Sequence, residues 1–180
     1  LMALYSAHLP WHGTLARYHA DKMNMINQAK EKVDIHTNPI TIRDGFFFDN
    51  QSLFPTSALP LFGEHNQKNA CVVLRVLQML GLDLMKAEPA FQTFTPLKHR
   101  LQPCGEVGGV LYINDSIATL PEPVMAALDT FKACPITLIV GGWDGGYDYT
   151  SLNQMIVDRH ITAIALPTTG DKITTPHHVE

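Results

Sequence analysis

The sequence has no apolar run long enough to cross a membrane. Its longest candidate, residues 70–84, is interrupted by Arg75, Gln78 and Asp83, whereas a spanning helix needs about 20 mostly apolar residues. Basic clusters are also missing, and the net charge of −4 gives none of the positive surface that nucleic-acid binding requires. No basic amphipathic stretch indicates a membrane surface. We therefore expect neither a nucleic-acid partner nor a membrane partner.

Cysteine is scarce as well. Cys71, Cys104 and Cys134 are odd in number and widely spaced, which excludes a disulfide framework and a Cys-x-x-Cys metal site. Residues 1–10 lack the basic start and the cleavage site of a secretory signal. Reduced thiols without such a signal favour a cytoplasmic protein. Because residue 1 is leucine rather than methionine, we also expect the chain to begin inside a larger one.

Several common site motifs are absent: the phosphate-binding P-loop, the Gly-x-Gly-x-x-Gly fingerprint and the nucleophile elbow. The glycine-rich stretch 141–146 fits neither glycine spacing, so we interpret it as a flexible loop between a strand and a helix. His8 and His12 are four residues apart, but Pro10 between them argues against a helical zinc pair. We expect residues 7–13 to form a loop.

The first half of the chain has the alternating patterns of a small α/β domain. We expect a short strand at 1–6, and a helix from the N-cap Thr14 to about residue 28. Turn residues between short apolar runs predict an antiparallel meander. The expected strands are 39–42, 46–48 and 53–54. A helix at 66–80, ending at Gly81, and a connection at 88–97 follow them.

The second half, after a domain boundary near Lys98, alternates strands with helices. This order predicts a parallel, Rossmann-like half sheet. The expected elements are strands at 101–107, 110–113, 136–140 and 161–166, and helices at 121–132 and 151–157, with Ser151 near the cap of the last.

Polar residues follow the apolar stretch 110–113, which we expect to be a buried strand. Asn114, Asp115 and Ser116 come directly after it, and Pro121 then opens a helix. Ligands of open α/β sheets bind outside the carboxyl ends of the strands, so this loop is a candidate site. An Asx turn that simply leads into the helix is the alternative.

One lysine stands on an expected apolar helix face. Leu15, Tyr18, Lys22 and Met25 share that face by helical spacing. Either Lys22 extends its charged end to solvent along the apolar surface, or it is held in a functional site.

Five segments occur in an order that resembles the Mur ligase family. The resemblance covers nearly the whole chain, and it rests on the ordered set more than on any one segment. It implies an α/β fold: the C-terminal part of a P-loop-type central ATPase domain (1–98, without its phosphate loop) and an incomplete Rossmann-like C-terminal domain (99–180). The segments are 7–13, 63–70, 97–100, 114–119 and 138–142.

The resemblance implies an ATP-dependent acid–amino-acid ligase of cytoplasmic peptidoglycan precursor synthesis, and so of cell-wall biogenesis, cell shape and cell division. Its substrates would be UDP-N-acetylmuramoyl-L-alanine and glutamate, and its cofactors would be ATP and Mg²⁺. The reaction would proceed through an acyl phosphate, and the enzyme would be a monomer. Another ligase of the superfamily, such as one similar to folylpolyglutamate synthase, and a nucleotide-binding module without catalysis remain alternatives.

The family's metal segment maps onto the start of the chain. By resemblance His8 matches a ligand of a second Mg²⁺, and Lys22 matches the lysine that is carbamylated in the family. A carbamate supplies the anionic oxygens that Mg²⁺ prefers, which would explain a lysine on an apolar face.

The family's nucleotide contacts map onto four residues. Asn66 and Asn69 match residues near the adenine, while Arg100 and Asp115 match contacts to ATP. Amides can donate to and accept from a base edge, and arginine suits phosphate. A helix cap with a solvated neighbour, a surface ion pair and a turn are the respective structural alternatives.

Substrate contacts and departures from the family come last. Ser116 and Thr119 match the loop that faces the muramoyl substrate and glutamate, with helix capping as the alternative. Ligases that add D-glutamate have lysines at Ile117 and near Gly146, so the sequence is similar to the branch that adds L-glutamate. The family's phosphate loop, N-terminal domain and last helices are missing, so we expect the chain alone to be inactive.

Overall fold

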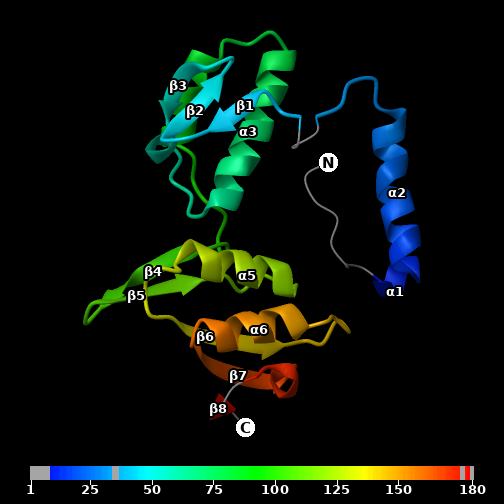
Figure 1. Ribbon diagram of the computed structural model, residues 1–180, viewed down its shortest axis with the longest axis vertical. Helices are drawn as coiled ribbons and strands as arrows, with labels where there is room; N and C mark the ends of the chain where they lie inside the picture. The colour runs from blue at the N-terminus through cyan, green and yellow to red at the C-terminus, as the bar shows by residue number, and fades with distance from the viewer. Residues whose placement is uncertain (1–8, 34–36, 175–176, 179–180) are drawn as a thin grey trace. The chain divides into compact units, whose positions relative to one another are not determined.

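The computed structural model describes residues 9–33, 37–174 and 177–178 (Figure 1). The chain divides into two compact units, Leu1–Leu97 and Lys98–Glu180, each described here by itself. That the two units are ligase domains stays a prediction. The strand expected at 1–6 lies outside the described residues. No helix in the described part of the chain is long and apolar enough to cross a membrane.

Unit 1 begins with two helices, α1 (Leu9–His12) and α2 (Leu15–Gln28). The predicted cap of α2 is confirmed, because Thr14 Oγ1 accepts a hydrogen bond from the Arg17 N–H at 3.2 Å. The loop expected at 7–13 is wrong for residues 9–12. Pro10 lies in the first turn of α1, where its missing N–H has no helical partner to lose.

The predicted meander is confirmed. The strands are β1 (Ile40–Ile42), β2 (Gly45–Phe48) and β3 (Gln51–Pro55), paired antiparallel in the order β1-β2-β3. Asp49 and Asn50 connect β2 to β3 with φ of 50° and 62°. Positive φ at both residues matches the twist of a two-residue hairpin.

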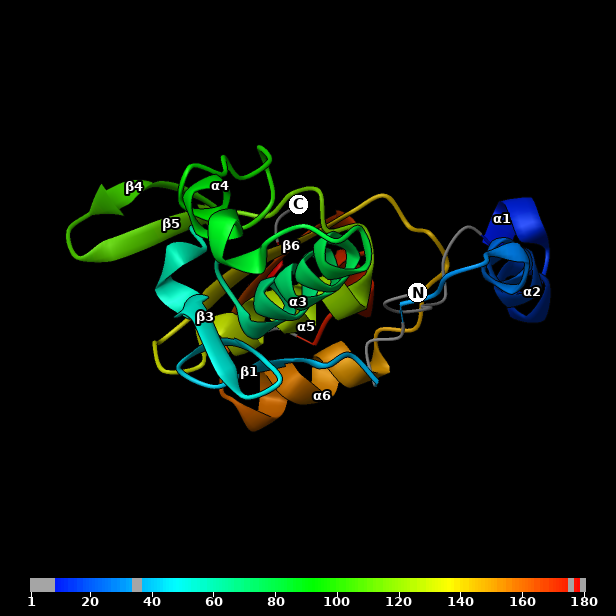
Figure 2. The same ribbon diagram turned by 90° about the horizontal axis from the view of Figure 1, so that it is seen from above.

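The helix α3 (Glu64–Met79) covers the meander (Figure 1, Figure 2). It ends as the sequence predicts. Gly81 has a φ of 72°, its N–H donates to Gln78 O, and the Leu82 N–H donates to Leu77 O. These two bonds satisfy carbonyls that the end of a helix leaves free.

The connection expected at 88–97 is partly wrong, because its start is helical. Two 3-10 helices, η1 (Thr56–Ala58) and η2 (Leu84–Ala87), and the short helix α4 (Glu88–Gln92) complete unit 1. Pro89 lies in the first turn of α4, which tolerates proline. Phe91 then packs on the core, with its ring centroid 5.2 Å from that of Phe54.

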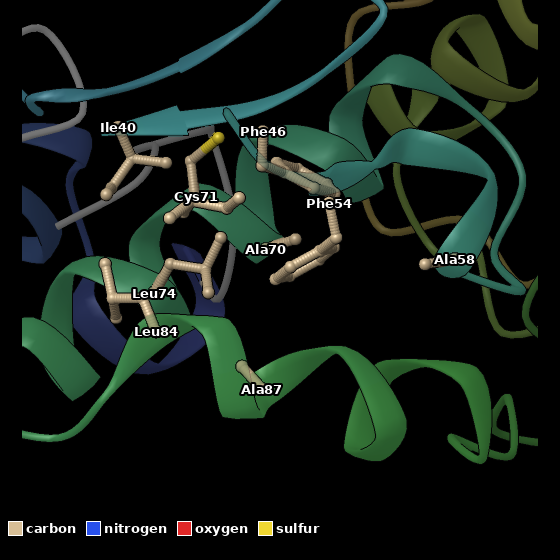
Figure 3. Close-up of a cluster of buried hydrophobic side chains, with 10 residues drawn as sticks. Ile40, Phe46, Phe54, Ala58, Ala70, Cys71, Leu74, Leu84 and Ala87 are labelled. Carbon is tan, nitrogen blue, oxygen red and sulfur yellow. The ribbon is translucent and has the colours of Figure 1, made fainter. Parts of the chain in front are cut away.

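The core of unit 1 lies between the meander, α3 and the η2 segment (Figure 3). Phe46 and Leu74 are fully buried there. Burying an apolar side chain of this size contributes about 1.5–3 kcal/mol. No described residue of α1 or α2 belongs to this core cluster.

Unit 2 begins with an antiparallel hairpin, β4 (Gln102–Val107) and β5 (Val110–Asn114). The expected burial of 110–113 is wrong: Val110, Leu111 and Tyr112 are 55%, 45% and 54% exposed. Within the described residues β5 pairs with β4 alone. A two-stranded ribbon leaves much of both faces uncovered, so an apolar sequence there is not a buried one.

The parallel sheet contains the later strands. It consists of β6 (Thr137–Gly142), β7 (Thr162–Thr168) and β8 (His177–His178), in the order β6-β7-β8. The expected parallel pairing is thus confirmed for β6 and β7 and wrong for β5. Three helical segments accompany the sheet: α5 (Pro121–Thr130), α6 (Thr150–Asp158) and η3 (Gly170–Lys172).

The helices α5 and α6 pack together over the core of unit 2, in which Leu152 and Ala163 are fully buried. The N-cap of α6 is Tyr149, so Ser151 lies near the cap as the sequence predicts. Asp148 precedes the cap, and its Oδ1 accepts hydrogen bonds from the N–H and the hydroxyl of Thr150 at 2.9 and 2.6 Å.

Candidate functional site

Lys22, the expected carbamylation site, lies one turn after Tyr18 on α2. Its Nζ is 5.7 Å from the centroid of the Tyr18 ring, within the range of a cation–π contact. The expected apolar face is not buried as a whole. Tyr18 is buried, whereas Lys22 is exposed and Leu15 and Met25 are 41% and 74% exposed.

A histidine–aspartate pair that the sequence motifs missed lies beside the same tyrosine, which His12 contacts. His12 Nδ1 lies 2.8 Å from Asp21 Oδ2, which links α1 to α2. The His12 ring also stands edge-on to Tyr18, with centroids 5.1 Å apart. His12 and Asp21 belong to different helices, so no periodic pattern pairs them. His8, the other expected metal ligand, lies outside the described residues.

Asn66 and Asn69 lie on one face of α3, as their spacing predicts. Asn66 is 7% exposed, and its Nδ2 donates to Phe62 O at 2.7 Å. Asn69 is exposed and donates from Nδ2 to Asn66 Oδ1 at 3.4 Å. The buried asparagine therefore has a structural task, while the second presents its amide to solvent.

The structure brings two of the expected segments together in unit 2. Asp115 Oδ1 accepts a hydrogen bond from the Leu101 N–H at 2.9 Å. Asn114 Nδ2 lies 3.1 Å from His99 Nδ1, and the Ile117 N–H donates to His99 O at 3.2 Å. The loop before β4 and the loop after β5 are thus one hydrogen-bonded cluster.

The remaining expected residues lie at the surface of that cluster. Arg100, Ser116 and Thr119 are exposed. The Ser116 N–H donates to Asn114 Oδ1 at 3.0 Å, which is the Asx turn that the sequence offered as an alternative. The turn leaves the Ser116 hydroxyl outside the network, so turn and site do not exclude each other.

A second polar cluster, not expected from the sequence, lies at the carboxyl ends of β6 and β7. Lys172 Nζ is 2.5 Å from Asp144 Oδ2, and Asp144 Oδ1 accepts from the Gly146 N–H at 2.9 Å. Thr169, which is 3% exposed, donates from both its N–H and its hydroxyl to Gly142 O at 3.2 Å. The two charged partners are 28 positions apart in the sequence, so motifs do not reveal this pair.

The ion pair shifts the pKa values of both Asp144 and Lys172. The hydrogen bond from Lys172, followed by that from the Gly146 N–H, lowers the pKa of Asp144 below its ordinary 3.8. The same hydrogen bond raises the pKa of Lys172 above 10.5. Desolvation, followed by the charge of Asp144, raises the pKa of the nearby Tyr149. Each group of the pair therefore holds the other in its charged form.

The described residues do not form a ready-made metal centre. No three or more His, Cys, Asp or Glu side chains gather among residues 9–33, 37–174 and 177–178. Next to Lys22 in the sequence, Asp21 pairs with His12, and these two side chains are donors that a metal ion could use.

Comparison with solved structures identifies the fold. MurF from Acinetobacter baumannii aligns with 99% of this chain and 49% of its own, with a TM-score of 0.74 and 15% sequence identity. This likeness shows a Mur ligase fold and nothing finer. No family model matches the chain.

Curated relatives carry the comparison further. A UDP-N-acetylmuramoyl-L-alanine–L-glutamate ligase of Xanthomonas euvesicatoria pv. vesicatoria (strain 85-10) is 32% identical over 96% of this chain and 42% of the relative. The enzyme of the same name from Salinispora tropica is 33% identical over 95% and 45%. That of Xanthomonas campestris pv. campestris (strain 8004) is 36% identical over 83% and 37%.

The chain is similar to Mur ligases over nearly its whole length. These relatives all bear the name UDP-N-acetylmuramoyl-L-alanine–L-glutamate ligase. The chain spans less than half the length of each.

Proposed function

We propose that this chain is part of an ATP-dependent ligase that joins L-glutamate to UDP-N-acetylmuramoyl-L-alanine in peptidoglycan precursor synthesis. The supporting observation is identity of 32–36% over 83–96% of the chain to relatives with that name. The name of these relatives specifies L-glutamate, and the absence of the lysines expected at Ile117 and near Gly146 favours the same branch. A cytoplasmic location and a monomeric state stay predictions.

The reaction divides into two steps. The terminal phosphoryl group of ATP passes to the carboxylate of the alanine residue, which forms an acyl phosphate and ADP. The amine of glutamate then attacks the acyl carbon, the amide bond forms, and phosphate and a proton leave. Both steps gather anionic groups, so the protein must supply donors and cations where that charge lies.

In unit 1 we assign nucleotide binding to α3. Asn69 has an exposed amide that can donate to and accept from the edge of adenine. Asn66 does not contact the base directly in this assignment. Its buried amide is committed to Phe62 O and to Asn69, and it holds the Asn69 amide in one orientation.

In unit 2 we assign nucleotide contacts to the cluster around Asp115. Its Oδ1 is committed to the Leu101 N–H, whereas no described residue donates to its Oδ2, which leaves that oxygen for a ribose hydroxyl. Arg100 is exposed and its guanidinium contacts no carboxylate in the described part of the chain, so it is available for phosphate. Ser116 and Thr119 present exposed hydroxyls for the muramoyl substrate and glutamate.

Magnesium would be held beside the middle of α2, where Asp21 and Lys22 lie. Mg²⁺ supplies charge neutralisation to phosphoryl transfer when bound. The donor chemistry around Lys22 fits it, because Asp21 is a carboxylate one residue away and a carbamate on Lys22 would add a second oxygen group. The Tyr18 ring beneath Lys22 Nζ and the His12–Asp21 contact hold these donors on one side of α2. His8 stays a predicted ligand.

An assay of the full product of the gene tests this function. We expect ADP release that requires both UDP-N-acetylmuramoyl-L-alanine and glutamate, with faster turnover for L-glutamate than for D-glutamate. The 180-residue chain alone is the control and should form no amide. ADP release without the muramoyl substrate, or ligation of glutamate only to a folate, would replace the proposal with one of the two alternatives.

A further inference from the structure

The ion pair between Asp144 and Lys172 has no part in the function argued so far. It lies at the end of the sheet where β6 and β7 stop, with the loop after β6 and η3 at the same end (Figure 1). Ligands of open parallel sheets bind outside this end of the strands. The pair therefore lies where unit 2 is expected to meet a ligand.

Hydrogen bonds among the two loops fix the orientation of the Lys172 side chain. Asp144 is held on both oxygens, by the Gly146 N–H at 2.9 Å and by Lys172 Nζ at 2.5 Å. Thr169 links the two loops a second time through Gly142 O. An ammonium has three N–H donors, and Asp144 is the only acceptor for Lys172 Nζ among the described residues. With its side chain 46% exposed, Lys172 has two donors left for an anion from solvent.

The charges around Lys172 select the kind of anion. Asp144 is anionic at neutral pH, because the hydrogen bond from Lys172 lowers its pKa, and its charge offsets that of the ammonium. A phosphate group of a nucleotide, which carries more negative charge than a carboxylate, would meet the Asp144 carboxylate as well as Lys172. The carboxylate of an amino acid carries a single charge, and the ammonium of the same molecule offsets the repulsion from Asp144.

We propose that Lys172 binds a carboxylate of the glutamate substrate and that Asp144 is a positioning residue, which aims the Lys172 ammonium at it. This assignment rests on the proposed function and names the cation that would replace the lysines missing at Ile117 and near Gly146. Lysine suits the task because its ammonium is a compact charge with freely rotating donors.

The test compares variants of the full product of the gene. A charge-assisted hydrogen bond of about 1.5–3 kcal/mol predicts that Lys172→Met raises the KM for L-glutamate about 10- to 100-fold, with the KM values for ATP and the muramoyl substrate unchanged. Lys172→Arg should recover part of the loss, and Asp144→Asn should give an intermediate increase. Lys132→Met is the matched control, because Lys132 is exposed and lies in the turn before the amino end of β6.

A second measurement works without ligation. Titration of the 180-residue chain with L-glutamate should shift the amide resonances of Gly146 and Thr169, and Lys172→Met should abolish the shifts while the rest of the spectrum is kept. The assignment is overturned if Lys172→Met leaves the KM for glutamate unchanged and shows the same glutamate-induced amide shifts as the parent chain. A rise in the KM for ATP instead makes the ion pair a phosphate site. If glutamate shifts these resonances but the full product of the gene shows no ligase activity, the proposed function is refuted and glutamate binding by Lys172 is retained.

Discussion

Asp115 and Leu101 are joined by a hydrogen bond of 2.9 Å, from the backbone N–H of the leucine to the carboxylate of the aspartate. Leu101 has a φ of 42°, a left-handed conformation that residues other than glycine rarely adopt. His99, two residues earlier, has a φ of 64°. The bond therefore holds a strained turn, and it places Arg100 between two fixed residues.

Removing the carboxylate should loosen that turn. Asp115→Ala leaves the Leu101 N–H without its acceptor, and Leu101 itself is 5% exposed. Leaving a buried donor unsatisfied costs about 1–3 kcal/mol. We expect hydrogen exchange of the Leu101 amide to accelerate about 10- to 100-fold in the variant. Asp115→Asn keeps an acceptor at the same place and should retain most of the protection; equal loss in both variants would show that charge, and not the bond, holds the turn.

Substitutions of the two asparagines of α3 should differ in their effects on stability and on the KM for ATP. Asn69→Ala removes an exposed amide, so the free energy of unfolding should change by less than about 0.5 kcal/mol while the KM for ATP rises. Asn66→Ala removes a buried one, leaves Phe62 O without the amide donor, and should cost stability as well as affinity. Thermal unfolding and initial rates measure the two effects. If Asn69→Ala leaves the KM for ATP unchanged, the adenine assignment is wrong.

The pH dependence of the Asp144–Lys172 pair has a definite sign on each side. The depressed pKa of Asp144 makes its contribution to stability fully present above 3.8 and lost as the pH falls through the lower folded value. The raised pKa of Lys172 makes its contribution present below 10.5 and lost as the pH rises through the higher folded value. The pair therefore contributes across the whole neutral range.

Carboxylate resonances followed by NMR as a function of pH check this. In Lys172→Met the pKa of Asp144 should return toward its ordinary value, because its largest perturbation is gone. Asp148 is the internal control: its pKa is lowered by the side chain and N–H of Thr150 and should not respond. Thr150→Ala should reverse the pattern. A joint response of both aspartates to either change would contradict the assigned causes.

Two adjacent glycines at the end of β6 should respond differently to alanine. Gly141 and Gly142 have φ of 138° and 123°, so alanine is strained at both, by about 1–3 kcal/mol. Only at Gly141 would the new Cβ also meet a neighbour, 2.9 Å from Leu166 Cβ and closer still to the Leu166 carbonyl oxygen. Denaturant unfolding should show a larger loss for Gly141→Ala than for Gly142→Ala. Equal losses would mean that β6 and β7 separate to accept the methyl group.

Local signals in the sequence were sufficient for most elements of unit 1. Thr14, the Asp49–Asn50 turn and Gly81 act through bonds and φ values within a few residues, and each lies where the pattern predicts. The errors arose where a local rule permits two outcomes. Proline ends a helix or begins one, and Pro10 and Pro89 both lie in a first turn.

The misassigned strand in unit 2 has another cause. The apolar run 110–113 predicts burial only if other elements cover it, and the hairpin turn at Gly108 and Gly109 pairs it with β4 instead. Burial is a property of the partners, which the run itself does not contain.

The candidate site residues also fall into two groups, those placed by local spacing and those brought together by the fold. Asn66 and Asn69 share a helix face by spacing alone, whereas Lys172 meets Asp144 only because β6 and β7 pair in parallel and end together. The His12–Asp21 contact likewise depends on the angle between two helices. Contacts of this kind follow from the fold, so sequence motifs do not contain them.

The three thiols differ in a way that makes the chain its own reporter of local opening. Cys71 in unit 1 is 4% exposed, and burial raises its pKa to about 11, whereas Cys104 and Cys134 in unit 2 are exposed. Since thiolates are the reactive species, a maleimide dye added to the native chain should attach to unit 2 alone. A third equivalent of dye would then enter only when α3 lifts from the meander, so its rate of uptake measures the unfolding of unit 1 without any engineered probe.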